Sequence, residues 1–126
     1  MLRKMRNEKG FTLIEIIAVL VILGILAAAA VPRYVSLQEE ARASAAQAAI
    51  AEVKAQANQY YAVNTLRNGA PPPIASITTS VTTAPDVGPD FGVTAAVNGT
   101  NGINISVGTV RGIAITAVTG YWTMPQ

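Results

Sequence analysis

The chain has 126 residues, of which 51% are hydrophobic and 13% are charged, so it is more apolar than an ordinary soluble domain. It contains no cysteine and no histidine, which excludes disulfides, the usual zinc sites and Ser/His or Cys/His catalysis. The formal charge is +2, but residues 11–126 hold five basic residues against six acidic ones. Without a basic surface we expect no nucleic-acid partner. Because histidine, cysteine and a buried pair of acids are missing, we also predict no enzyme activity, cofactor or metal.

Residues 1–10 form a short basic leader with four Lys or Arg and one Glu. The 21 residues that follow, 11–31, are apolar and carry Glu15 as their only charge. As a helix they would span about 30 Å, the thickness of a bilayer core. Cations in front of such a helix keep the N-terminus in the cytoplasm and send the rest of the chain across the membrane. The sequence therefore predicts a hydrophobic transmembrane helix over 11–32, to which the resemblance described below adds a role in assembly.

The next segment, 33–68, has the pattern of an amphipathic helix rich in alanine. We interpret Pro32 as a kink in one continuous helix; the alternative is two helices joined there. Asn68-Gly69 is typical of a C-terminal cap, and the prolines at 71–73 prevent the helix from continuing. Its apolar residues recur at spacings of three and four: Ala46, Ile50, Val53, Ala57 and Tyr60 or Tyr61.

Beyond the prolines, hydrophobic residues alternate with polar ones in three short runs, "FGVTAAVN", "GINISVG" and "GIAITAV". The residues 98–102, "NGTNG", predict a hairpin loop, and Arg111-Gly112 predicts the next turn. In the third run we expect Ile113, Ile115 and Ala117 to share the apolar face. Residues 74–90 are read as a Thr-rich strand or a loop.

A β-rich region over 69–126 is too small to bury a core alone, so we expect it to pack on the amphipathic helix 33–68. The predicted fold is therefore α+β. It consists of a long N-terminal helix, with a protruding hydrophobic half and an amphipathic half, packed against a small antiparallel sheet of about three to four strands.

Two processing interpretations compete at the N-terminus. In the first, residues 11–26 are the hydrophobic region of a conventional signal peptide and the alanines at 27–30 mark its cleavage site, which would release a soluble secreted domain. A glutamate inside that region fits this interpretation poorly.

In the second interpretation, "GFTLIEIIAVLVILGILAAAAVPRY" resembles type IV prepilins, which carry a class III signal, and the pseudopilins of type II secretion. The resemblance covers roughly the first half of the chain. The stretch "VPRYVSLQEEARASAA" is similar to pilins of the mannose-sensitive haemagglutinin type, although the cysteine pair of many pilins is missing here. The matching residues, in the family's order and spacing, are Gly10, Phe11, Thr12, Glu15, Gly24 and Pro32.

The resemblance implies that a prepilin peptidase cuts between Gly10 and Phe11 and N-methylates Phe11. It also implies assembly roles for Phe11, Thr12 and Glu15, whose carboxylate would pair with the new amine of its own chain or of a neighbour. On assembly, the helix between Gly24 and Pro32 is expected to melt.

The expected function is that of a pilin, a structural subunit of an extracellular type IV pilus filament. The resemblance implies that the precursor waits in the bacterial inner membrane, where the pilus assembly platform receives it, and that it then polymerises as a helical homo-oligomer. A pseudopilin of a periplasmic type II secretion filament is the alternative, and a secreted domain with a conventional signal peptide is a remote one. Asp86 and Asp90 fall short of a calcium site and are read as turn residues.

Overall fold

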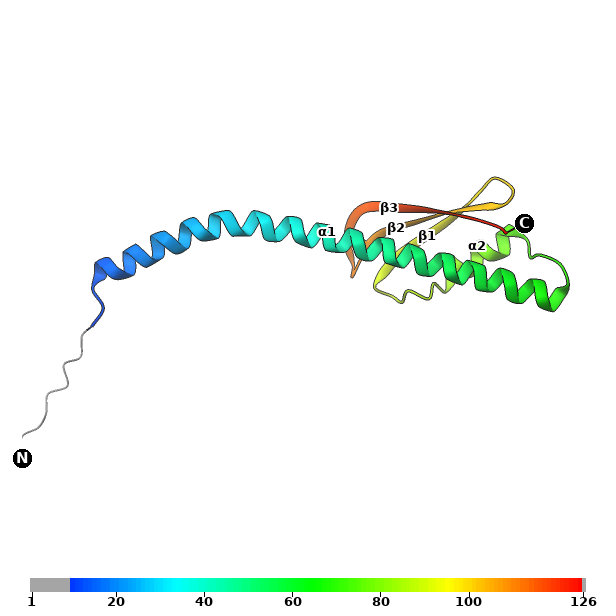
Figure 1. Cartoon of the computed structure of the whole chain (residues 1–126), viewed down its shortest axis with the longest axis horizontal. Helices are drawn as coiled ribbons and strands as arrows, with labels where there is room; N and C mark the ends of the chain where they lie inside the picture. The colour runs from blue at the N-terminus through cyan, green and yellow to red at the C-terminus, as the bar shows by residue number, and fades with distance from the viewer. Residues whose placement is uncertain (1–9, 126) are drawn as a thin grey trace, which may run out of the picture. The chain divides into compact units, whose positions relative to one another are not determined.

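The structure is a computed structural model that describes residues 10–125 (Figure 1). The predicted leader, apart from Gly10, lies outside the described residues. The chain divides into two compact units, residues 1–37 and 38–126, and each is described by itself. The elements are the helices α1 (Leu13–Asn68) and α2 (Ile74–Thr83) and the strands β1 (Phe91–Asn98), β2 (Gly102–Val110) and β3 (Ile113–Thr123).

Helix α1 runs for 56 residues with Pro32 inside it. The prediction of one continuous helix is confirmed, and the alternative of two helices joined at the proline is wrong. Because proline has no N–H, only the single hydrogen bond that this position would donate is lost. The helix ends at Asn68, where Gly69 takes a φ of 66° and its N–H donates to the Thr65 carbonyl at 2.9 Å. This is the glycine cap that the sequence predicted.

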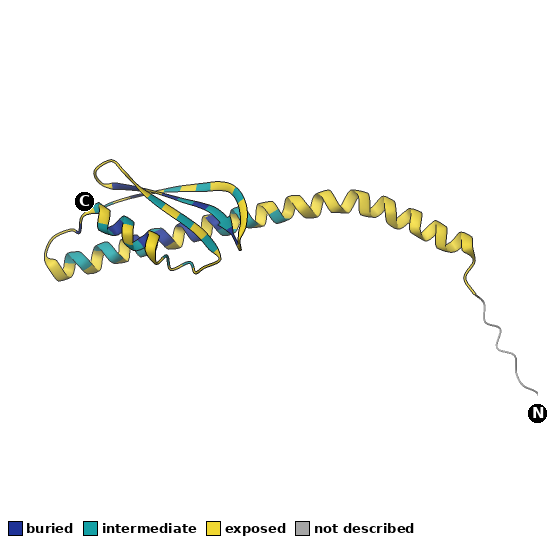
Figure 2. Cartoon of the chain, turned by 180° about the vertical axis from the view of Figure 1, so that it is seen from behind, coloured by how far each residue is buried: buried dark blue, intermediate teal, exposed yellow. Residues whose placement is uncertain are grey.

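The unit 38–126 is built around one core in which α1, α2 and one face of the sheet meet (Figure 2). The three strands form an antiparallel meander in the order β1-β2-β3, which confirms the predicted α+β fold with its small sheet. Small residues on the inner side of α1 let the sheet approach closely. The buried residues of α1 are Ala46, Ala49, Ile50, Val53 and Ala57, and those of β2 are Ile103, Ile105, Val107 and Val110.

Both predicted turns of the meander are confirmed. Asn98 pairs with Gly102, and Gly99 between them has a φ of 72°. At the second turn Val110 pairs with Ile113, and the two residues between them have positive φ, 52° for Arg111 and 75° for Gly112. Two central residues with positive φ give a hairpin turn whose twist matches that of the strands it joins.

The predicted apolar face of the third strand is wrong in part. Ile115 packs against the core, but Ile113 is 46% exposed and Ala117 is exposed. Pairing with β2 is irregular between Val107 and Thr109, and this irregularity shifts the alternation along β3. The core side of the strand is therefore continued by the even-numbered residues Val118, Gly120 and Trp122.

For residues 74–90 we predicted a Thr-rich strand or a loop. This prediction is wrong for 74–83, which form helix α2. Seven of its ten residues are β-branched, which made a strand the better reading by propensity. Ile77 and Val81, four positions apart, are fully buried against the sheet and hold the segment as a helix. The threonine hydroxyls donate back to carbonyls four residues earlier, as Thr78 does to Ile74 at 2.9 Å.

The C-terminal end of β3 is tied to α1 by side chains. The indole Nε1 of Trp122, which is 5% exposed, donates to Asn58 Oδ1 at 2.8 Å. The Tyr61 hydroxyl donates to the Pro125 carbonyl at 3.1 Å. These bonds satisfy the polar ends of aromatic residues whose rings pack on the core.

At Gly120, β3 approaches the side chains of α1 closely. A Cβ at this position would collide with the Cγ2 of Ile50. We expect Gly120→Ala to lower the free energy of unfolding by about 1–3 kcal/mol, since the overpacked contact forces the helix and strand apart. Thermal unfolding in detergent, followed by Trp122 fluorescence, measures this loss. Gly108→Ala is the matched control, because a Cβ there meets nothing within 4 Å, and equal midpoints for the two variants would contradict the prediction.

Candidate functional site

The predicted cleavage site lies in non-helical chain. Gly10, Phe11 and Thr12 precede the first residue of α1, Leu13. Phe11 is 84% exposed, and nothing lies within 4 Å of the position of a Cβ on Gly10. The peptide bond between Gly10 and Phe11 is thus accessible and outside any helix, as a protease that binds its substrate in extended form requires.

Thr12 and Glu15 form a reciprocal hydrogen-bonded cap at the start of α1. The Glu15 N–H donates to Thr12 Oγ1 at 3.3 Å, and Glu15 Oε2 accepts from the Thr12 N–H at 3.0 Å and from its hydroxyl at 2.9 Å. This is the capping box that Thr-x-x-Glu produces before an apolar helix. The cap was not among the predicted features, although the spacing of Thr12 and Glu15 is the sequence signal for it.

The capping box fixes the Glu15 carboxylate at the positive end of the helix dipole, which favours its charge. All its hydrogen bonds within residues 10–125 are made through Oε2. Oε1 accepts none in that part of the chain, so the carboxylate can cap its own helix and still receive a cation from outside.

Phe11 and Glu15 lie beside the same surface hollow. They border a shallow hollow of about 460 Å³, whose other lining residues are Ile16, Val19 and Leu20. A charged oxygen therefore lies beside an aromatic ring and aliphatic side chains. This surface offers one charged group together with apolar contact area.

Helix α1 leaves its N-terminal apolar surface uncovered in the single chain, and every residue from 10 to 37 is exposed (Figure 2). By length and composition, α1 could cross a membrane, and no residue of its most apolar stretch is buried. Contiguous apolar surface of this size marks a membrane or protein contact. The exposed fractions of Phe11, Leu13, Ile14 and Ile25 all exceed 65%.

Gly24 and Pro32 lie farther along α1, away from the capping box. Both are within regular helix, and no side chain lies close enough to Gly24 to require a glycine there. Neither residue is therefore explained by packing within one chain. Melting of α1 between Gly24 and Pro32 on assembly stays a prediction. The cryo-EM density of an assembled filament would show whether this stretch is still a regular helix.

Asp86 and Asp90 serve the loops around them through their backbones. The Asp86 N–H donates to Gln56 Oε1 at 3.2 Å, and the Asp90 carbonyl accepts from the Arg111 N–H. Within residues 10–125, no three acidic, histidine or cysteine side chains gather in one place. The reading of these two aspartates as turn residues agrees with these contacts.

Comparison with known proteins places the N-terminal segment in a family. Residues 5–31 match the prokaryotic N-terminal methylation motif. The chain is 46% identical over 55 residues to type II secretion system core protein G of Pseudomonas aeruginosa, a match that covers 44% of this chain and 39% of that protein. It is also 46% identical over 61 residues to the type IV narrow pilus major component PilA5 of Thermus thermophilus, covering 48% of this chain and 49% of that protein.

No solved structure matches the chain significantly. The matches span about half or less of the length of these relatives. The chain thus combines a methylation motif and a long apolar helix with a small antiparallel sheet. In its N-terminal half the chain is similar to both a type IV pilin and a type II secretion pseudopilin.

Proposed function

We propose that this protein is a pilin that polymerises through the N-terminal part of α1 into an extracellular type IV pilus. The observation that carries the proposal is the apolar helix, wholly exposed in one chain and headed by a capped glutamate. In a bilayer the lipid covers this surface, and in a filament the same surface of neighbouring subunits does so.

The proposed sequence of events begins with the precursor in the bacterial inner membrane, its N-terminus in the cytoplasm. A prepilin peptidase hydrolyses the bond between Gly10 and Phe11, and the α-amino group of Phe11 is then methylated. This amine stays cationic at neutral pH. The assembly platform adds the subunit to the filament, where the amine of one subunit pairs with Glu15 of another.

A pseudopilin is the second candidate, favoured by the identity to type II secretion system core protein G. The N-terminal chemistry is common to both candidates, so the location of the filament separates them. The two candidates are distinguished by shearing the protein from the surface of the cells that make it and determining the mass of its N-terminal peptide.

Recovery of surface fibres whose subunits begin with methyl-Phe11 is the expected result. Methylated subunits found only in the periplasm would favour the pseudopilin. A mature chain that begins near Val31 would leave only the secreted domain with a conventional signal peptide.

A further inference from the structure

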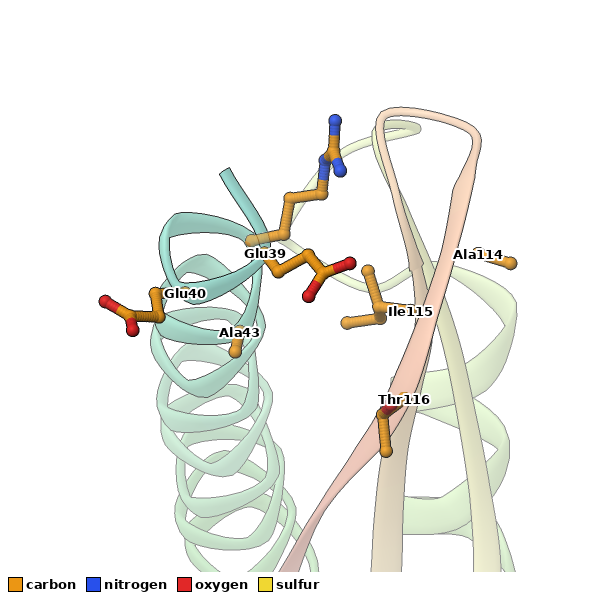
Figure 3. A pocket seen from close by; sticks show the side chains of 7 residues that line it. Glu39, Glu40, Ala43, Ala114, Ile115 and Thr116 are labelled. Atoms are coloured by element: carbon orange, nitrogen blue, oxygen red, sulfur yellow. The ribbon is translucent and has the colours of Figure 1, made fainter. Parts of the chain in front are cut away.

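A cleft separates the first turns of α1 in the unit 38–126 from β3. It has a volume of about 460 Å³ and an apolar wall formed by Ala43, Ala114 and Ile115. Figure 3 shows Glu39 directing its carboxylate from α1 toward Ile115 on the strand, whereas the Glu40 carboxylate points away from the strand. The cleft thus presents one of two adjacent carboxylates.

The Glu39 carboxylate accepts no hydrogen bond and has no cation within 4.0 Å among residues 10–125. Arg42 also lines the cleft, but its guanidinium donates a long bond of 3.5 Å to Gln38 Oε1 and makes no ion pair with Glu39. A carboxylate above an apolar wall is complementary to a long side chain with an aliphatic stem and a cationic head. Arginine has this structure, and its planar group can donate two bonds to one carboxylate.

We propose that this cleft receives Arg33 of a neighbouring copy in the filament, so that an Arg33–Glu39 pair joins adjacent subunits. The inference rests on the proposed function and adds a second ionic contact to the one between the Phe11 amine and Glu15. The direction of the offset between subunits supports it. In both pairs the cation comes earlier in the chain than the acid, so one displacement of the neighbour along α1 serves both.

The size of the offset agrees as well. Phe11 precedes Glu15 by four positions and Arg33 precedes Glu39 by six, which correspond to about 6 and 9 Å of helix. The chain before Leu13 is not helical, and a more extended residue rises by about 3.3 Å, so the first offset is longer than four helical residues. Long side chains span the small difference that remains.

No other cation of α1 meets this condition. Arg42 is followed by its next acid, Glu52, only after ten positions. Lys54 and Arg67 have no acidic residue after them in α1. Melting between Gly24 and Pro32 does not disturb the proposed pair, because it leaves the spacing from Arg33 to Glu39 unchanged in every subunit.

Charge reversal tests the pair in the full chain. We expect Arg33→Glu and Glu39→Arg each to lower the amount of sheared filament about tenfold relative to membrane-bound subunit, because each places like charges in the contact. The combined variant restores opposite charges and should recover to within about threefold of the parent. Glu40→Arg is the matched control, since it makes the same charge change one residue away on a side chain directed out of the cleft, and should stay within about twofold.

Thermal unfolding of each variant in detergent checks its fold. If Glu39→Arg unfolds, Glu39→Gln replaces it and should lower filament yield while its unfolding temperature stays at the parent value. The pair is wrong if the double variant recovers no more filament than the worse single variant, or if Glu40→Arg is as harmful as Glu39→Arg. Normal filaments from both single variants, together with loss of filaments from a Glu15 variant, would overturn this inference and leave the proposed function standing. Absence of filaments from the parent chain would overturn the function itself.

Discussion

Glu15→Gln is expected to reduce filament assembly to background while cleavage, methylation and the start of α1 remain intact. Glutamine is the neutral counterpart of glutamate at this position of a capping box, so its Oε1 can still accept from the Thr12 N–H. What the variant removes is the negative charge. In the apolar interior of a filament this leaves the neighbouring amine of Phe11 as an unpaired charge, which strongly disfavours the contact.

Thr12→Ala is the matched control for the Glu15 variant. It removes the hydroxyl that accepts from the Glu15 N–H, but it keeps the carboxylate. Loss of a helix cap costs about 1 kcal/mol, so a modest decrease in filament yield is expected. Sheared fibres and the mass of the N-terminal peptide are measured for both variants. Parent levels of fibre from Glu15→Gln, or an equal loss from both variants, would contradict a role for the charge.

Gly10→Val is expected to leave most of the protein as uncleaved precursor in the membrane, and therefore to abolish filaments. A β-branched side chain restricts the backbone next to the bond between Gly10 and Phe11 and adds bulk where the peptidase must bind closely. The substitution should not affect the fold, since a Cβ at Gly10 meets nothing within 4 Å. The ratio of precursor to mature chain on a denaturing gel measures the effect.

Gly24→Val controls for a general effect of replacing an exposed glycine. Its site is equally open but lies within α1, far along the chain from the predicted cut, so normal cleavage is expected. If Gly10→Val is cleaved as well as Gly24→Val, the proposed recognition of Gly10 is wrong. If neither is cleaved, the defect lies in membrane insertion and not at the scissile bond.

The helix and the meander could be predicted from the sequence because their signals are local. Alanine-rich periodicity, the Asn68-Gly69 cap and the Arg111-Gly112 turn each act within a few residues. Helix α2 could not be read in this way, because its Ile and Thr content favours a strand. Its conformation is decided by burial of Ile77 and Val81 against strands that follow later in the chain.

The register of β3 depends on pairing and not on composition. Alternation within "GIAITAV" gives one apolar face only if the strand pairs evenly with β2, and the irregularity between Val107 and Thr109 of β2 prevents this. At the candidate site the roles of Gly10, Phe11, Thr12 and Glu15 in cleavage and assembly stay predictions. The cap between Thr12 and Glu15 could have been predicted as well, because the Thr-x-x-Glu motif stands in the sequence.

The unbroken course of α1 through Pro32 has a mechanical consequence. If neighbouring subunits hold one another by residues near Phe11 and Glu15, a pulling force on the fibre enters each subunit along a single backbone. That backbone continues to Asn58, whose side chain holds the Trp122 indole of β3. Tension then passes along this backbone and reaches the sheet by way of the buried alanine face. A subunit loaded in this way should extend at its weakest helical stretch before its core yields.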